Sequence, residues 1–149
     1  MKTRKIPSIC LILFLALLFS SPGRTESVVQ IQVKTILASK EAGTTDSRLK
    51  DLARELQSVF RYSSYQLLGR TSLNLTTNRP GRVSLPEGRT MTIIPKGSKG
   101  GRVTLELEIL KNNSQIFQTV IRLRNKSSVT IGGPEYRGGN LLFNIFASF

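Results

Sequence analysis

Apolar and polar residues alternate along most of the sequence, and this period of two is typical of strands that bury one face. The alternating runs cover residues 29–37, 65–75, 83–93, 103–109, 117–123, 129–131 and 141–147. The clearest pair is 103–109 and 117–123, because the polar residues 111–114 (Lys-Asn-Asn-Ser) between them are typical of a hairpin loop. The pattern predicts about seven strands.

Glycine and proline interrupt three of these runs. Gly69 predicts a bulge or a close backbone approach in the second run, since a glycine inside a strand has no side chain to pack. Residues 86–88 (Pro-Glu-Gly) predict a turn that interrupts the third strand before it continues. Residues 132–134 (Gly-Gly-Pro) predict a turn that leads into the last strand.

One segment follows the helical period instead. Its apolar positions recur at three- and four-residue spacing and are Leu49, Leu52, Ala53, Leu56, Val59 and Phe60. Thr45 and Asp46 precede them, and such residues cap helices by accepting hydrogen bonds from the first free N–H groups. The spacing predicts an amphipathic helix over about 46–60 that docks its apolar stripe on a sheet.

These elements together predict an α+β fold that is mainly β. About seven strands and one early amphipathic helix favour an antiparallel β-sandwich or a partly open barrel, with the helix covering one face or one end. Residues 24–149 are expected to form a single β-rich domain, since a chain of that length buries enough surface to fold alone.

The first 23 residues have the three parts of a secretory signal peptide in order. Lys2, Arg4 and Lys5 form a positive start, residues 9–19 are all apolar, and small residues follow up to Gly23. The apolar run is well short of the ~20 residues that span a bilayer as a helix. We therefore predict cleavage near Gly23 and export. The alternatives are a cut after Ser27 and an uncleaved membrane anchor.

The chain is strongly basic, with 22 Lys and Arg residues against 9 Asp and Glu and a net charge of +13. Three of the basic residues lie in the predicted signal, so residues 24–149 keep 19 of them and a net charge of +10. This excess favours anionic partners. The residues predicted to form a basic binding face are Arg79, Arg82, Arg89, Lys96, Lys99 and Arg102. The alternative is a well-solvated surface that keeps the protein soluble.

The expected partner of this face is an acidic protein or an anionic component of the cell envelope, such as a lipid headgroup or a glycan. Nucleic acid is disfavoured by export and by the sequence, which has no zinc-finger spacing and no aromatic ribonucleoprotein signature.

The sequence lacks several of the residue types that enzymes most often use for catalysis. The sequence has no histidine, and its single cysteine, Cys10, lies in the predicted signal, so the commonest general base, thiolate nucleophile and zinc ligands are missing. Glu106 and Glu108 share one strand face about 7 Å apart, a spacing that can imitate a glycosidase pair but fits surface carboxylates better. No catalytic, cofactor-binding or metal-ligating residue is predicted, and the protein is not expected to be an enzyme.

A Tyr-Ser-Ser-Tyr junction at residues 62–65 follows the predicted helix. With the early strand, the helix and the glycine-rich segment before the last strand, it resembles a group of small secreted proteins of Gram-negative bacteria with no established activity. The resemblance implies a location in the periplasm or cell envelope. Physically, Tyr62 and Tyr65 are expected to pack beneath the helix terminus with their hydroxyls at the rim.

The predicted function is that of a secreted or periplasmic binding or scaffolding module, an accessory of envelope assembly or secretion, that uses its basic face to bind an acidic partner. A small outer-membrane β-barrel is the first alternative, because the last strand alternates up to the terminal Phe149. A hydrolase is the second alternative. No G-x-S-x-G pattern supports it.

Overall fold

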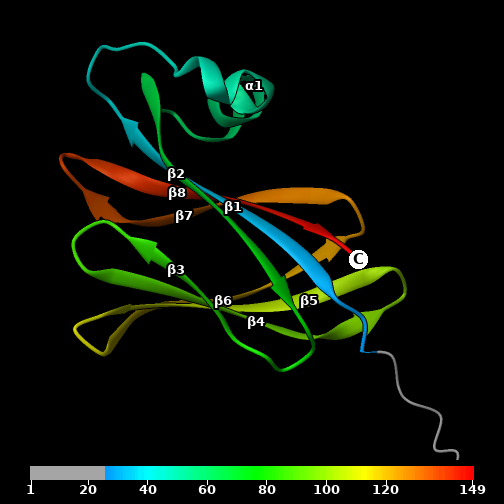
Figure 1. The fold of residues 1–149 in the computed structure, drawn as a ribbon. Helices are drawn as coiled ribbons and strands as arrows, with labels where there is room; N and C mark the ends of the chain where they lie inside the picture. The colour runs from blue at the N-terminus through cyan, green and yellow to red at the C-terminus, as the bar shows by residue number, and fades with distance from the viewer. Residues whose placement is uncertain (1–25) are drawn as a thin grey trace, which may run out of the picture.

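The computed structural model describes residues 26–149, in which eight strands form two antiparallel four-stranded sheets packed face to face (Figure 1). The strands are β1 (Val29–Ser39), β2 (Ser64–Leu75), β3 (Gly81–Leu85), β4 (Arg89–Lys99), β5 (Arg102–Lys111), β6 (Ser114–Arg124), β7 (Ser127–Tyr136) and β8 (Gly139–Ser148). One sheet has the order β2-β1-β8-β7 and the other β3-β4-β5-β6. Of the two predicted architectures, the sandwich is the one found.

The prediction of about seven strands is short by one, because residues 86–88 join two strands rather than interrupting one. β3 and β4 pair antiparallel, with Leu85 opposite Arg89. Glu87 and Gly88 between them have positive φ values of 60° and 66°, which reverse the chain within three residues. The hairpin between β5 and β6 is confirmed where it was predicted.

The main core lies between the two sheets, and β5 shows how the sequence builds it. Val103, Leu105, Leu107 and Ile109 are completely buried, whereas Thr104, Glu106 and Glu108 between them are only partly covered. Burying one such apolar side chain is worth about 1.5–3 kcal/mol, so a strand with this alternation has a strong preference for one orientation.

A bulge in β2 sends its apolar residues to two different cores. Leu68 has no counterpart on β1, so the bulge predicted at Gly69 is confirmed within one residue. An extra residue shifts the alternation of a strand by one position. Tyr65 and Leu67 therefore pack on the outer face of their sheet, whereas Leu75 packs between the sheets.

The helix α1 (Lys50–Val59) and the 3-10 turn η2 (Ser47–Leu49) lie on the outer face of the β2-β1-β8-β7 sheet at one end of the sandwich (Figure 1). Leu49, Leu52 and Leu56 are buried there in a second core with Ile36, Ala38, Tyr65, Leu67 and Leu142. The Asp46 carboxylate caps the segment by accepting a hydrogen bond from the Arg48 N–H at 2.9 Å. The helix predicted over about 46–60 and its docking on a sheet are confirmed.

Tyr62 and Tyr65 pack beneath the end of α1, edge to face with their ring centres 6.4 Å apart. The Tyr65 hydroxyl lies within hydrogen-bond distance of the Leu56 carbonyl in the last turn of α1 (3.0 Å) and of the carbonyl of Phe60, which follows the helix. Burial raises the pKa of Tyr65. The expected packing is confirmed, but the rim position is wrong for Tyr65, because its side chain is completely buried with its hydroxyl against the carbonyls of Leu56 and Phe60.

The turn predicted at residues 132–134 is wrong. β7 continues through this segment with an irregular register between Gly132 and Glu135. A Cβ on Gly133 would clash with the Phe143 ring, so the segment lies against the core rather than at a chain reversal. The reversal occurs at Arg137 and Gly138, which both have positive φ.

The predicted signal peptide and Cys10 lie outside the described residues. Within residues 26–149, no helix is long and apolar enough to cross a membrane.

We call the end of the sandwich with α1 and the turns at residues 86–88, 112–113 and 137–138 the helix end. The opposite end has the turn at residues 100–101 and the connections 76–80 and 125–126, and we call it the basic end.

Candidate anion-binding site

The turn between β4 and β5 brings two cationic residues face to face at the basic end. Gly100 and Gly101 have positive φ values of 59° and 69°, which suit a two-residue hairpin turn and are unstrained for glycine. They place Lys99 directly opposite Arg102. Both side chains are exposed.

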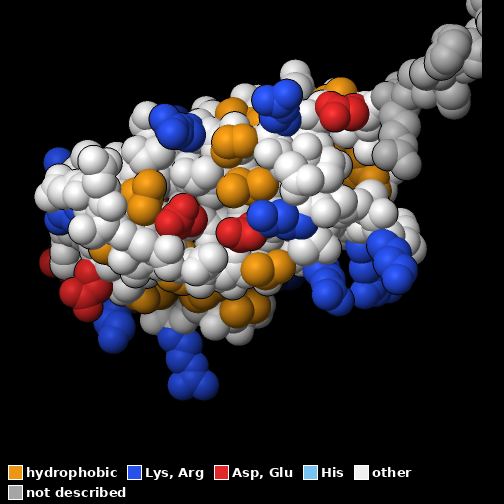
Figure 2. Space-filling view, turned by 90° about the horizontal axis from the view of Figure 1, so that it is seen from below, with side chains coloured by type: hydrophobic (Ala, Val, Ile, Leu, Met, Phe, Trp, Pro, Cys, Tyr) orange, Lys and Arg blue, Asp and Glu red, His pale blue; other side chains and the backbone are white. Residues whose placement is uncertain are grey.

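The neighbouring strand β6 adds two more cations to this end. Arg124 lies directly opposite Arg102, and Arg122 lies opposite Thr104. Leu123 between them is buried, so the two arginines are on the outer face of the β3-β4-β5-β6 sheet. Figure 2 is viewed from the side of this sheet and shows a group of Lys and Arg side chains near one end, with others elsewhere on the surface. We call Lys99, Arg102, Arg122 and Arg124 the basic cluster.

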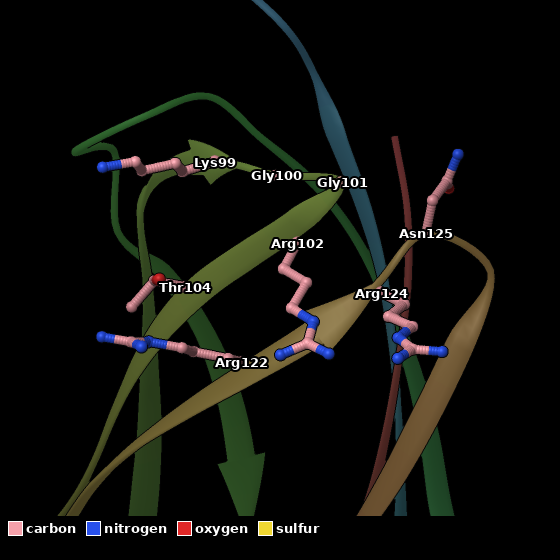
Figure 3. A pocket seen from close by; sticks show the side chains of 8 residues that line it. All are labelled: Lys99, Gly100, Gly101, Arg102, Thr104, Arg122, Arg124 and Asn125. Atoms are coloured by element: carbon pink, nitrogen blue, oxygen red, sulfur yellow. The ribbon is translucent and has the colours of Figure 1, made fainter.

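The basic cluster surrounds an open hollow of about 910 Å³ (Figure 3). Its lining residues come from β4, β5, β6 and their connections, and they are Lys99, Gly100, Gly101, Arg102, Thr104, Arg122, Arg124 and Asn125. None of them is acidic. A guanidinium group offers several N–H donors in one plane and can bind carboxylate or phosphate oxygens in pairs, so the hollow is suited to an anion.

The four cations of the basic cluster have no acidic partner within 4.0 Å in the described part of the chain. The ion pairs found there are Asp46 with Arg48, Glu87 with Arg89 and Lys111, and Glu106 with Lys96. Like charges directly opposite each other on neighbouring strands are destabilising. Lys99, Arg102 and Arg124 form such a row across three strands, so the arrangement costs stability rather than adding to it.

Four of the six predicted binding residues lie at or near the basic end. Lys99 and Arg102 line the hollow. Arg79 is exposed on the connection between β2 and β3, next to Asn78, whose N–H donates to the Pro95 carbonyl. Lys96 lies at a bulge of β4, and its ammonium group is 3.0 Å from the Glu106 carboxylate. Its charge is therefore partly balanced.

The other two predicted residues do not belong to this site. Arg82 lies on β3 and lines a separate hollow with Gly88, Thr90, Leu110, Asn112 and Asn113. Arg89 is a correction to the predicted face, because its side chain is buried with 8% exposure. It is 2.8 Å from Glu87 and donates to the Glu135 carbonyl, which links the two sheets, while its Nε and Nη1 have no partner.

Sequence reasoning missed Arg122 and Arg124. The signal was available, because both alternate with the buried-type residues Ile121 and Leu123 and so had to be on the solvent face. If residues are paired one by one outward from the predicted hairpin loop at 111–114, residue 124 falls close to residue 102 on the neighbouring strand. The predicted binding face contained cations that are close together in sequence. Arg122 and Arg124 are about 20 residues further along the chain and reach the site through the pairing of β6 with β5.

Glu106 and Glu108, the two carboxylates whose spacing could imitate a glycosidase pair, have different neighbours. Glu106 pairs with Lys96 and accepts a hydrogen bond from Gln118 at 3.5 Å. Glu108 lies opposite Thr92 and Gln118 on the neighbouring strands. Within residues 26–149, no three His, Cys, Asp or Glu side chains come together as they would to hold a metal ion.

The chain matches no model of a known protein family, and a search of curated proteins finds no significant match. The resemblance to small secreted proteins of Gram-negative bacteria therefore stays a prediction.

Proposed function

We propose that this chain is an exported, non-enzymatic binding module that engages an anionic partner through its basic cluster. The observation that carries the proposal is the row of like charges formed by Lys99, Arg102 and Arg124, with Arg122 beside it and no acidic partner among the described residues. A bound anion would turn this unfavourable arrangement into a favourable one.

The cost of the row supports a binding role. A like-charged pair directly opposite on neighbouring strands costs up to about 1 kcal/mol, because each cross-strand pair contributes roughly 0.2–1 kcal/mol in either direction. The same strands place acids beside cations elsewhere, as Glu106 does for Lys96. The chain can therefore pair charges on this sheet, and it leaves the basic cluster unpaired.

Binding is a better fit than catalysis for the chemistry of the hollow. Its lining contains three arginines, one lysine, one threonine, one asparagine and two glycines. Arginine stays protonated at physiological pH, so it supplies positive charge and donors but no general base. The hollow is also open, and water would compete with any reaction there.

The export part of the proposal depends on residues 1–23. N-terminal sequencing of the protein recovered from a periplasmic extract should give a start after Gly23 or Ser27. An intact Met1 would contradict cleavage.

Binding can be tested with polyacrylate, a carboxylate polymer that has no peptide backbone. The double variant Arg122→Ala/Arg124→Ala should weaken binding about tenfold at ~0.05 M NaCl, because charge pairs are little screened there. The matched control is Lys34→Ala/Arg70→Ala, which removes two directly opposite cations from the other sheet. The control should change the dissociation constant less than about threefold, and the difference between the two should fade near ~0.5 M NaCl.

Equal losses in the two double variants would contradict the proposed site, since net charge alone would then explain binding. Vesicles that contain phosphatidylglycerol, titrated in parallel, separate phosphate from carboxylate recognition. A response of the basic cluster to the vesicles alone would assign the partner to anionic lipid.

A further inference from the structure

The strand β6 has a free edge. It is the last strand of the β3-β4-β5-β6 sheet, and within residues 26–149 no strand pairs with its outer side. From Phe117 to Arg124 its register with β5 is unbroken for eight residues, a length of about 27 Å. A regular edge of this length is a template on which another strand can pair.

The backbone groups at this edge can be assigned from the alternation of hydrogen bonds in antiparallel strands. The two-residue turn after Lys99 makes Lys99 and Arg102 a hydrogen-bonded pair, so even-numbered residues of β5 point their backbone groups to β4 and odd-numbered ones to β6. The partners of the odd-numbered residues on β6 are also odd-numbered. The even-numbered residues of β6, from Gln118 to Arg124, therefore direct N–H and C=O to the free edge. The Arg124 carbonyl accordingly accepts from the Ser127 hydroxyl at 2.7 Å, away from β5.

The other three edge strands are protected or shorter. β3 has five residues, and β7 is interrupted by the irregular register before Glu135, next to Pro134. On β2 the edge near the helix is occupied: the Asp46 N–H donates to the Tyr65 carbonyl, and Arg48 donates to the Leu67 carbonyl. Bulges, prolines and covering segments are the usual ways to prevent pairing at an edge. Between Phe117 and Arg124, β6 has no bulge and no proline, although the Ser127 hydroxyl already occupies its outward Arg124 carbonyl.

The side chains along β6 indicate what kind of strand would fit. On the outer face, Val120 is 57% exposed and is followed by Arg122 and Arg124 of the basic cluster. On the inner face, Phe117 and Ile121 are only partly buried at the rim of the main core. A strand added here would meet cations on one face and an apolar rim on the other.

We propose that an extended acidic segment of a partner protein adds to β6 as a fifth strand, with acidic and apolar residues alternating along it. Its acidic side chains lie beside Arg122 and Arg124, and its apolar side chains cover Phe117 and Ile121. Its backbone pairs with the groups that the even-numbered residues of β6 direct outward. This inference rests on the proposed function, because the basic cluster supplies the charge complementarity, and it names the partner as a peptide strand rather than a lipid or a glycan.

The test uses a labelled octapeptide of alternating Glu and Val, with its binding followed by fluorescence anisotropy. Val120→Pro removes one outward N–H and keeps every charge and the pairing with β5, since proline is tolerated where the N–H faces away from the neighbouring strand. It should weaken peptide binding about tenfold, which is the upper end of the loss expected from one backbone hydrogen bond. The matched control is Val120→Thr, which keeps the N–H and should change binding less than about threefold.

Polyacrylate separates this inference from the proposed function, because it has carboxylates but no backbone to pair. Val120→Pro should leave polyacrylate binding unchanged, whereas Arg122→Ala/Arg124→Ala should weaken the binding of both probes. A urea unfolding curve checks that Val120→Pro folds. A fully N-methylated Glu-Val peptide tests the same backbone pairing on the unaltered protein and should not bind.

Three results would overturn one proposal or the other. Full peptide binding by Val120→Pro, together with binding of the N-methylated peptide, overturns strand addition and leaves the anion-binding function standing. Unchanged binding of both probes by Arg122→Ala/Arg124→Ala overturns the function itself. Self-association in sedimentation that Val120→Pro abolishes assigns the edge to a second copy of this chain and overturns the acidic partner.

Discussion

The two ends of the sandwich differ in how their charged side chains are paired. At the helix end, the carboxylate of Asp46 accepts hydrogen bonds from the Arg48 side chain, and this pair covers the edge of β2. Arg89 is buried there and joins Glu87 to the Glu135 carbonyl. Charges at this end hold elements of the fold together.

At the basic end, apart from the Lys96–Glu106 ion pair, cations lie opposite other cations. Lys99, Arg102 and Arg124 are adjacent across three strands, and no helix covers the outer face of their sheet within the described residues. The difference indicates that the fold does not depend on the basic cluster. Substitutions at the helix end should therefore change stability, and substitutions at the basic end should change binding.

The largest effect is expected from Leu56→Ala, which opens a cavity in the core beneath α1. Leu56 is completely buried, and the loss should lower the free energy of unfolding by about 2–5 kcal/mol in urea denaturation. The matched control on the same helix is Val59→Ala, because Val59 is 64% exposed and its loss should cost under about 0.5 kcal/mol. The folded Leu56→Ala protein should bind polyacrylate normally. Weakened binding would mean that the two ends are coupled.

A smaller effect of opposite sign is expected from Arg124→Thr. Removing the cation opposite Arg102 should raise the free energy of unfolding by about 0.2–1 kcal/mol at low salt, since it relieves a like-charged cross-strand pair. Arg122→Thr is the control, because it makes the same exchange on the same strand opposite Thr104 and should give a smaller gain. The difference between the variants should shrink toward ~0.5 M NaCl. A loss of stability in Arg124→Thr would show that the cation supports the fold.

The smallest effect concerns the pH dependence of Asp46→Asn, which keeps a capping side chain and removes its charge. Hydrogen bonds from the Arg48 side chain and backbone hold the pKa of Asp46 well below its ordinary value of 3.8. A lowered folded-state pKa adds stability that is present above the ordinary pKa and is lost as the pH falls through and below it. The difference in urea midpoint between the parent protein and Asp46→Asn should therefore be constant near neutral pH and shrink below pH ~4. The same exchange in an Arg48→Gln background should lose most of this pH dependence.

Particular residues show where sequence reasoning was sufficient. The alternation at 103–109 and 117–123 predicted the faces of β5 and β6 and the hairpin between them. The spacing of Leu49, Leu52 and Leu56 predicted the helix and its docking. In these segments each residue's environment follows from its near neighbours, because the period of a strand or helix is a local property.

Other residues could not be placed without the pairing of distant strands. Nothing in the sequence around Arg89 distinguishes it from an exposed arginine. Its side chain is buried where it donates to the Glu135 carbonyl in the opposite sheet. Arg122 and Arg124 joined the site only through their register with β5. Residues 132–134 look like a turn in sequence, but they lie within β7, where Gly133 comes close to the Phe143 ring.

The sequence by itself determined which residues are apolar on which face of each element, the early helix and the large excess of positive charge. The tertiary structure alone decided that the strands form two sheets, that β2 changes cores at Leu68, and that four cations meet around one hollow. The physical reason is that hydrophobic burial selects the face of a strand from its own alternation, whereas strand order and register depend on contacts between segments far apart in the chain.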